Sequence, residues 1–98
     1  MKHQHLHRSR SEITAAILEV ANGNRVRLSE ILYKTYLSHY NLKEYLLLLV
    51  EKGLIEYFKG ERTYKTAEKG MHLLRIYTDI RGLMVTRQKE ENTIMINY

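Results

Sequence analysis

One segment constrains the fold more than any other: a helical stretch that ends at a glycine and is followed at once by a hairpin pattern. Ser38 is a good N-cap and Gly53 a good C′ residue, so the sequence predicts a helix between them. The next residues, LIEYFKGERTYKT, predict short strands at 55–58 and 62–65 around a turn centred on Gly60. The chain therefore places one helix directly before a two-stranded hairpin.

Two shorter helices are predicted before this segment. Ser9 and Glu12 have the spacing of a capping box, which predicts a first helix over 10–21. Apolar residues at helical spacing predict a second helix over 28–35, and RVR at 25–27 could form a very short strand. Helix, turn, helix and hairpin in this order define a winged helix-turn-helix, a mainly α fold with a small β-hairpin (α+β). The third helix would be the recognition helix, and the hairpin would be the wing.

A fourth helix is predicted after the hairpin. Thr66 would cap it, and it would run from Ala67 to at least Ile80. Its core stripe is predicted to consist of Ala67, Met71, Leu74 and Thr78. The apolar end of the chain could be a strand or a docked extension, and the sequence leaves both open. The predicted organisation is a flexible basic arm at 1–10, a winged helix-turn-helix domain at 11–66, a dimerisation helix at 67–84 and a tail of uncertain structure at 85–98.

The fourth helix also carries a second apolar stripe, at spacings of three, four and three residues, as in a short coiled-coil seam. Its members are Leu73, Ile76, Ile80 and Leu83, with Tyr77 and Met84 at the rim. One small domain cannot bury both stripes of its terminal helix, and a patch of this size is unusual on a monomer. We therefore predict a homodimer through this seam. The alternative is that the tail folds back and covers it.

Three segments of the sequence resemble those of a known family. RSRSEITAAILEVANG, LSEILYKTYLSHYNLKEYLLLLVEKGLIEY and YKTAEKGMHLL stand in this order over about residues 8–80. The pattern resembles a family of small basic winged-helix DNA-binding proteins of archaea, which look like minimal transcription regulators or chromatin-type proteins. The resemblance implies a dimer built as an antiparallel coiled coil of long C-terminal helices. Gly82 lies inside that expected coiled coil and the tail after it is short, which argues against a long rod here.

Composition narrows the classes of function. The chain has 98 residues and a net charge of +5, which favours a polyanionic partner. There is no cysteine, and no phosphate-binding glycine loop or metalloprotease motif occurs, so we expect neither an enzyme nor a cofactor. No apolar run approaches the length of a membrane span. The expected location is cytoplasmic and nucleoid-associated.

The predicted recognition helix supplies the first candidate DNA contacts. Its first turns would carry the base-facing side chains, because this part of a recognition helix enters the major groove. Asn can read adenine with two hydrogen bonds, and Lys can reach guanine or phosphate. The candidates are Ser38, His39, Tyr40, Asn41, Lys43 and Glu44. Leu47 lies on the same side; it would pack beneath the wing near Tyr57 or Phe58, or touch DNA or a partner, and we favour the wing.

The wing and the arm supply the remaining candidates. Lys59, Arg62 and Lys65 surround the predicted turn, where they suit phosphate or minor-groove contact. Arg8 and Arg10 in the basic arm could follow a phosphate backbone. His3, His5 and His7 alternate in the same arm, but a metal site is not predicted, because no carboxylate or cysteine accompanies them.

The sequence thus predicts a sequence-selective double-stranded DNA-binding protein, a homodimeric transcription regulator. Two alternatives stay open: a non-specific, chromatin-like DNA-binding protein, and a winged-helix protein-interaction module without DNA binding.

Overall fold

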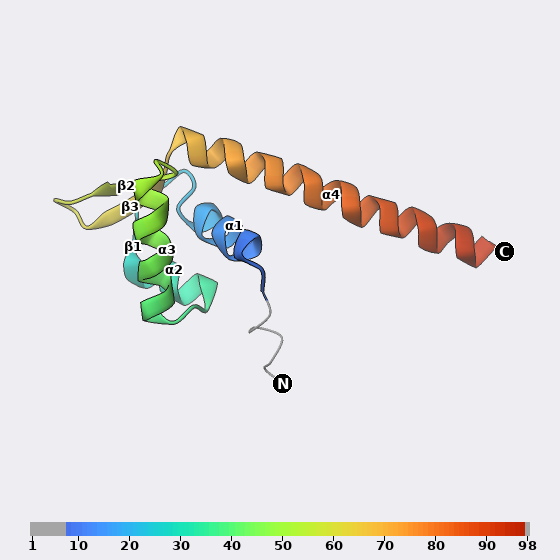
Figure 1. The fold of residues 1–98 in the computed structure, drawn as a ribbon, viewed down its shortest axis with the longest axis horizontal. Helices are drawn as coiled ribbons and strands as arrows, with labels where there is room; N and C mark the ends of the chain where they lie inside the picture. Colours follow the sequence, from blue (N-terminus) through green and yellow to red (C-terminus); the bar gives the residue numbers. More distant parts are fainter. Residues whose placement is uncertain (1–7, 98) are drawn as a thin grey trace.

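The computed structural model describes residues 8–97, and from residue 84 onward only the backbone of the last helix. The elements follow in the order α1 (Arg10–Val20), β1 (Val26–Arg27), α2 (Leu28–Thr35), α3 (His39–Glu51), β2 (Ile55–Phe58), β3 (Thr63–Thr66) and α4 (Glu68–Asn97). Figure 1 shows α1, α2, α3 and the strands gathered at one end of the molecule, from which α4 projects as a rod. The predicted winged helix-turn-helix is therefore confirmed as an α+β fold.

Local capping signals set the helix boundaries as the sequence predicted. The Ser9 hydroxyl accepts a hydrogen bond from the Glu12 N–H, and the Glu12 carboxylate accepts one from the Ser9 N–H, which completes the capping box of α1. The Ser38 hydroxyl accepts from the Asn41 N–H at 3.1 Å and caps α3. After α3 the chain reverses at Gly53, whose φ of 77° suits glycine.

The turn between α2 and α3 depends on an unusual backbone conformation. Tyr36, the C-cap of α2, has a φ of 58°, in the left-handed region that a bulky residue rarely adopts. Its N–H donates to the Leu32 carbonyl at 3.1 Å, which closes the last turn of α2. This single residue turns the chain from α2 into α3.

Three antiparallel strands form the sheet, in the order β1-β3-β2. The strand at the start of this sheet confirms the short strand expected at 25–27, and β3 begins at Thr63, one residue later than predicted. Ile55 pairs with Thr66 at the core end of the hairpin, and Tyr57 pairs with Tyr64 further out. Because side chains alternate along a strand, the sheet has one face toward the core and one toward solvent.

The core lies between the three short helices and the inner face of the sheet. Its buried members are Ile17, Leu18, Ala21, Val26, Ile31, Leu42, Leu46, Leu49, Leu54 and Ile55. Leu74 of α4 packs against this cluster, and Gly70 brings the helix backbone against the carbonyl of Leu54 with no room for a Cβ. The first turns of α4 are thus part of the domain.

Two predictions for α4 need correction. Thr66 does not cap the helix: it ends β3, and its buried hydroxyl donates to the Leu18 carbonyl at 2.7 Å. The predicted core stripe is also shifted, because Met71 and Thr78 are exposed while Gly70 is buried. The face of α4 that lies against α1 is therefore nearer to Gly70 and Leu74 than predicted.

The helix is also longer than predicted. It passes through Gly82 without a break and continues to Asn97, so the segment after 84 is neither a strand nor a docked extension. One glycine costs a helix only about 1 kcal/mol, which good helix formers on both sides offset. Gly82 therefore does not end the helix, which includes most of the segment at 85–98 whose structure the sequence left open.

Candidate nucleic-acid interface

One side of α3 is buried and the other faces solvent over its whole length. Leu42, Leu46 and Leu49 lie in the core, and each is at most 3% exposed. The opposite side begins at the N-terminus of the helix, where all the predicted recognition residues are exposed: Ser38, His39, Tyr40, Asn41, Lys43 and Glu44. The first turns of α3 are therefore available to a large partner.

The exposed side of α3 continues beyond these residues as a straight stripe. At about 100° per residue, Tyr40, Lys43, Glu44 and Leu47 fall within an arc of about 100°. Leu47 is 71% exposed, so the prediction that it packs beneath the wing is wrong. The stripe carries a cation, an anion, a phenol and an aliphatic side chain, and it is close to neutral in charge.

Two further tyrosines beside α3 were not predicted from the sequence. Tyr33 on α2 and Tyr36 in the turn are, with Tyr40, the most exposed large hydrophobic residues in the described part of the chain, at 79%, 82% and 72%. A phenol can donate a hydrogen bond to a phosphate oxygen and can pack on a base. A helical wheel of 28–35 places Tyr33 roughly opposite Leu28, Ile31 and Thr35, so its exposure could have been predicted. Nothing in the sequence indicated the left-handed conformation of Tyr36.

The wing is held in place by Arg25, which was not predicted from the sequence either. Its Nη1 donates to Glu61 Oε2 at 2.7 Å, and its guanidinium carbon lies 3.8 Å from the centroid of the Phe58 ring. The Glu61 carboxylate also accepts a hydrogen bond from the Thr63 hydroxyl. The hydrogen bond from Arg25, and next that from Thr63, lower the pKa of Glu61 below its ordinary value. This arrangement joins the loop before β1 to the tip of the hairpin.

The cations predicted on the wing lie at its tip and on β3. Lys59 and Arg62 are exposed in the turn, and Arg62 adopts a left-handed φ of 58°. Lys65 is half-buried beside Glu56, its cross-strand neighbour. Between residues 8 and 83, neither Lys59 nor Arg62 forms an ion pair. Alternation along β1 and β3 places Arg25 and Arg27 on the same face of the sheet as Lys65.

A tyrosine pair stiffens the hairpin on its other face. The rings of Tyr57 and Tyr64 are 4.8 Å apart and tilted by 39°, a favourable cross-strand aromatic contact. Burial, and then the neighbouring Tyr57, raise the pKa of Tyr64 above its ordinary value. The Tyr64 phenol is therefore neutral at physiological pH and can act as a hydrogen-bond donor.

The two arginines predicted in the basic arm lie within the described residues. Arg8 is half-buried and donates from Nη2 to the Thr35 carbonyl at 2.8 Å, which ties it to the end of α2. Arg10 is the first residue of α1 and is exposed. The rest of the predicted arm, with Lys2, His3, His5 and His7, lies outside the described residues.

The outer stripe of α4 is exposed as predicted. Leu73, Ile76, Ile80 and Leu83 become progressively more exposed along the helix, from 38% to 71%. Tyr77 differs from the prediction, because it is half-buried against α1 and not at the outer rim. The side chain of Met84 lies outside the described residues.

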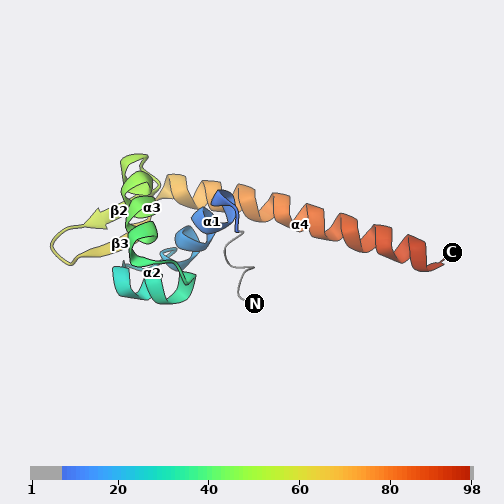
Figure 2. The same ribbon diagram turned by 60° about the horizontal axis from the view of Figure 1, so that its bottom comes forward.

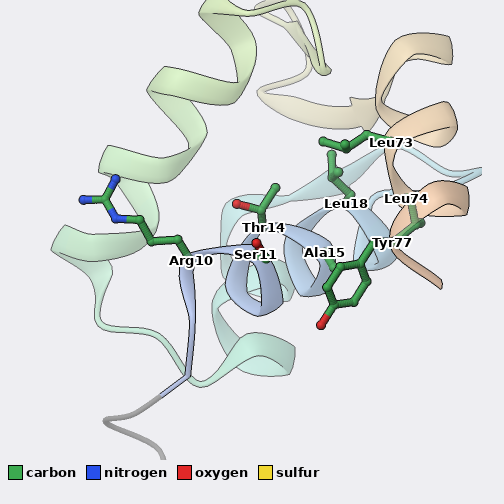
Figure 3. Close-up of a pocket in the computed structure, with 8 residues that line it drawn as sticks. All are labelled: Arg10, Ser11, Thr14, Ala15, Leu18, Leu73, Leu74 and Tyr77. Carbon is green, nitrogen blue, oxygen red and sulfur yellow. The ribbon is translucent and has the colours of Figure 1, made fainter. Parts of the chain in front are cut away.

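A shallow groove of about 240 Å³ separates α1 from α4 next to this stripe. Figure 3 shows Leu73 close to Leu18, and the Tyr77 ring beside Ala15, whereas the Arg10 side chain points away from these apolar residues. The groove is thus an apolar seam with hydroxyl groups of Ser11 and Thr14 at its edge. Like the exposed stripe on α4, the groove is lined mainly by apolar side chains.

Within the described residues, no group of three histidine or acidic side chains gathers as a metal site would require. In the same part of the chain, no helix has the length and apolar character needed to cross a membrane.

Comparison with known proteins agrees with this geometry. The family model described as winged helix-turn-helix matches residues 7–85, so the chain belongs to the winged helix-turn-helix family. The fold is similar to the crystal structure of Sso10a-2, a DNA-binding protein from Sulfolobus solfataricus, with a TM-score of 0.65 and 22% sequence identity. The match covers 89% of this chain and 96% of Sso10a-2. Among curated proteins, no significant match is found.

Proposed function

We propose that the protein binds double-stranded DNA as a homodimer and acts as a sequence-selective transcription regulator. Each protomer would insert α3 into a major groove and lay the wing on the adjacent backbone or minor groove. The observation that carries the proposal is the exposed, polar first part of α3, which is the second helix of the helix-turn-helix and is buried on its other side. Sso10a-2, which shares the fold, is described as a DNA-binding protein.

Side-chain chemistry on α3 supports base reading more than simple attraction to phosphate. Lys43 can bond to the acceptors of guanine, Glu44 can accept from the amino group of cytosine, and Asn41 can bond to adenine. These residues give α3 almost no net charge, so the phosphate contacts are assigned to other elements. The exposed cations Lys59 and Arg62 at the wing tip, with Lys65 on β3, are suited to that role.

The exposed stripe of α4 supports the dimer. Four aliphatic side chains in a row on a projecting helix would be unfavourable in water and are suited to a second α4. In Figures 1 and 2, the wing and the free end of α4 lie at opposite ends of the molecule. Pairing through α4 would therefore leave α3 and the wing of each protomer open to DNA.

The test is a titration of a labelled random-sequence duplex, followed by fluorescence anisotropy at several salt concentrations. We expect the affinity to fall steeply with salt, since each phosphate contact contributes about 0.9 to the slope of log K against log salt. The triple variant K43A/R62A/K65A should bind more weakly and with a shallower slope. The variant K52A/R75A/R81A removes the same charge from exposed sites away from the wing, and should retain the wild-type slope.

The same titration separates the alternatives. A regulator should prefer a selected site over random duplex by about 10³-fold or more, whereas a chromatin-like protein should bind both alike. If the wild-type protein binds no duplex even at low salt, the proposal is wrong and a protein-interaction module becomes the better interpretation.

A further inference from the structure

Leu47 is the one aliphatic residue in the stripe of α3 that the proposed function assigns to the major groove. It is 71% exposed, far more than its neighbour Leu48 at 41%, and it lies opposite the buried leucines of the same helix. On the helical wheel it lies within about 20° of Tyr40, one turn after Lys43 and Glu44. A helix that presents those residues to base edges therefore presents Leu47 as well.

The major groove offers one apolar group for such a side chain to contact. Adenine, guanine and cytosine expose donors, acceptors and ring C–H groups at their groove edges, whereas thymine alone exposes a 5-methyl group. A leucine cannot form hydrogen bonds with base edges, and facing polar edges it would displace water without compensation. Burial of the leucine side chain against a methyl group is favourable instead.

The surroundings of Leu47 fit DNA better than a protein surface. Its neighbours on the same side of α3 are Tyr40, Lys43, Glu44 and Glu51, all exposed and mostly charged. A protein interface centred here would have to desolvate these charges around Leu47 and the less exposed Leu48, and the cores of protein interfaces are depleted of charge. A major groove instead provides hydrogen-bond donors and acceptors next to each thymine methyl.

We infer that Leu47 contacts thymine methyl groups in the major groove, and that the protein thereby selects sites with thymine at a fixed position. This inference rests on the proposed function. Lys43 and Leu47 are four residues apart, about 6 Å along the helix axis. That distance is close to two base-pair steps of about 3.4 Å. The selected thymine should therefore lie about two base pairs from the base that Lys43 contacts.

The experiment begins with duplexes that the wild-type protein enriches from a random-sequence pool. Each enriched duplex is then made twice, once with thymine and once with uracil, which lacks only the 5-methyl group. We expect the wild-type protein to bind the uracil duplex about fourfold more weakly for each methyl group that Leu47 touches. Leu47→Ala should bind both duplexes with nearly equal affinity, and weaker than wild type binds the thymine duplex.

Leu48→Ala is the matched control, because it truncates the adjacent, less exposed leucine on the flank of the helix. It should keep the wild-type ratio between thymine and uracil duplexes. Uracil also alters duplex stiffness, but an effect of that kind would persist in Leu47→Ala, and such persistence would overturn the inference.

Two other results would also count against it. If the wild-type protein binds thymine and uracil duplexes equally, Leu47 does not contact the methyl groups, although the proposed DNA binding stands. If Leu47→Ala binds DNA with unchanged affinity and ratio, the side chain belongs to a protein contact or to solvent. Failure to bind any duplex would overturn the inference together with the proposed function.

Discussion

Arg25 and Glu61 are 36 positions apart in the chain, and the Arg25 Nη1 atom donates to Glu61 Oε2 at 2.7 Å. The pair connects the loop before β1 to the turn at the tip of the wing. Because the guanidinium also lies over the ring of Phe58, it is fixed in two directions. We interpret Arg25 as the residue that positions the wing, since its own charge is partly neutralised by the acid that it holds.

Arg25→Ala should raise the pKa of the Glu61 carboxyl toward its ordinary value, because the hydrogen bond from Arg25 is the main cause of its depression. A depressed pKa in the folded state means that the pair contributes stability above the unfolded-state pKa. That contribution is lost as the pH falls through the folded-state pKa. The change can be followed in a carboxyl carbon NMR titration of both proteins between about pH 2 and 7, a range that spans the usual carboxyl pKa values.

Arg27→Ala is the control for this titration, because Arg27 is a neighbouring exposed arginine without an ion pair in the described residues. It should leave the Glu61 titration unchanged. An identical Glu61 pKa in Arg25→Ala and the wild-type protein would show that the pair does not form in solution.

Gly70 and Gly82 lie in the same helix, and replacing each with alanine should change the free energy of unfolding in opposite directions. A Cβ at Gly70 would collide with the Leu54 carbonyl and approach Thr66 Cγ2, so Gly70→Ala should destabilise the fold by about 1–3 kcal/mol. At Gly82 a Cβ would meet nothing within 4 Å, so Gly82→Ala should stabilise the helix by about 0.5–1 kcal/mol. Urea unfolding monitored by circular dichroism measures both changes. A Gly70→Ala midpoint at or above that of the wild type would contradict the packing of α4 on Leu54.

Leu46 and Leu47 are adjacent in a run of four leucines and should respond differently to truncation. Leu46 is 2% exposed, so Leu46→Ala should cost about 2–5 kcal/mol of the free energy of unfolding. Leu47 is 71% exposed, and its truncation should change that free energy by less than about 0.5 kcal/mol. Equal losses for the two variants in urea unfolding would mean that the exposed side of α3 is covered in solution.

The sequence predicted those features of the fold that depend on neighbouring residues. The capping box at Ser9, the N-cap at Ser38 and the reversal at Gly53 each involve groups within a few positions, and the structure contains all three. Helical periodicity likewise separates the buried Leu46 and Leu49 from Leu47 on the opposite side of α3, although it does not show whether Leu47 is covered. Element order was then enough to predict the winged helix-turn-helix.

Features that depend on distant parts of the chain were missed or wrong. Threonine is a common N-cap residue, but the Thr66 hydroxyl donates to the Leu18 carbonyl, 48 positions away. The pairing of Arg25 with Glu61 likewise depends on the register of β1 with β3, which no local pattern specifies. Leu47 was expected beneath the wing because leucines are usually buried, and that tendency carries no information about where the hairpin lies.

The exposed stripe of α4 gives the last prediction, that two copies of the chain associate through it. Replacing Ile76 and Ile80 with aspartate places charge in the middle of the proposed helix pair, where desolvation of a carboxylate is unfavourable. I76D/I80D should therefore elute as a monomer in size-exclusion chromatography with light scattering, whereas the wild-type protein should elute as a dimer. The Thr78→Asp variant changes an exposed position between them and should remain dimeric.

The monomeric variant should also bind a two-half-site duplex more weakly, because the second α3 no longer benefits from the effective concentration that linkage provides. A wild-type protein that is monomeric at every concentration tested would refute the dimer, and DNA binding would then have to be explained by a single protomer.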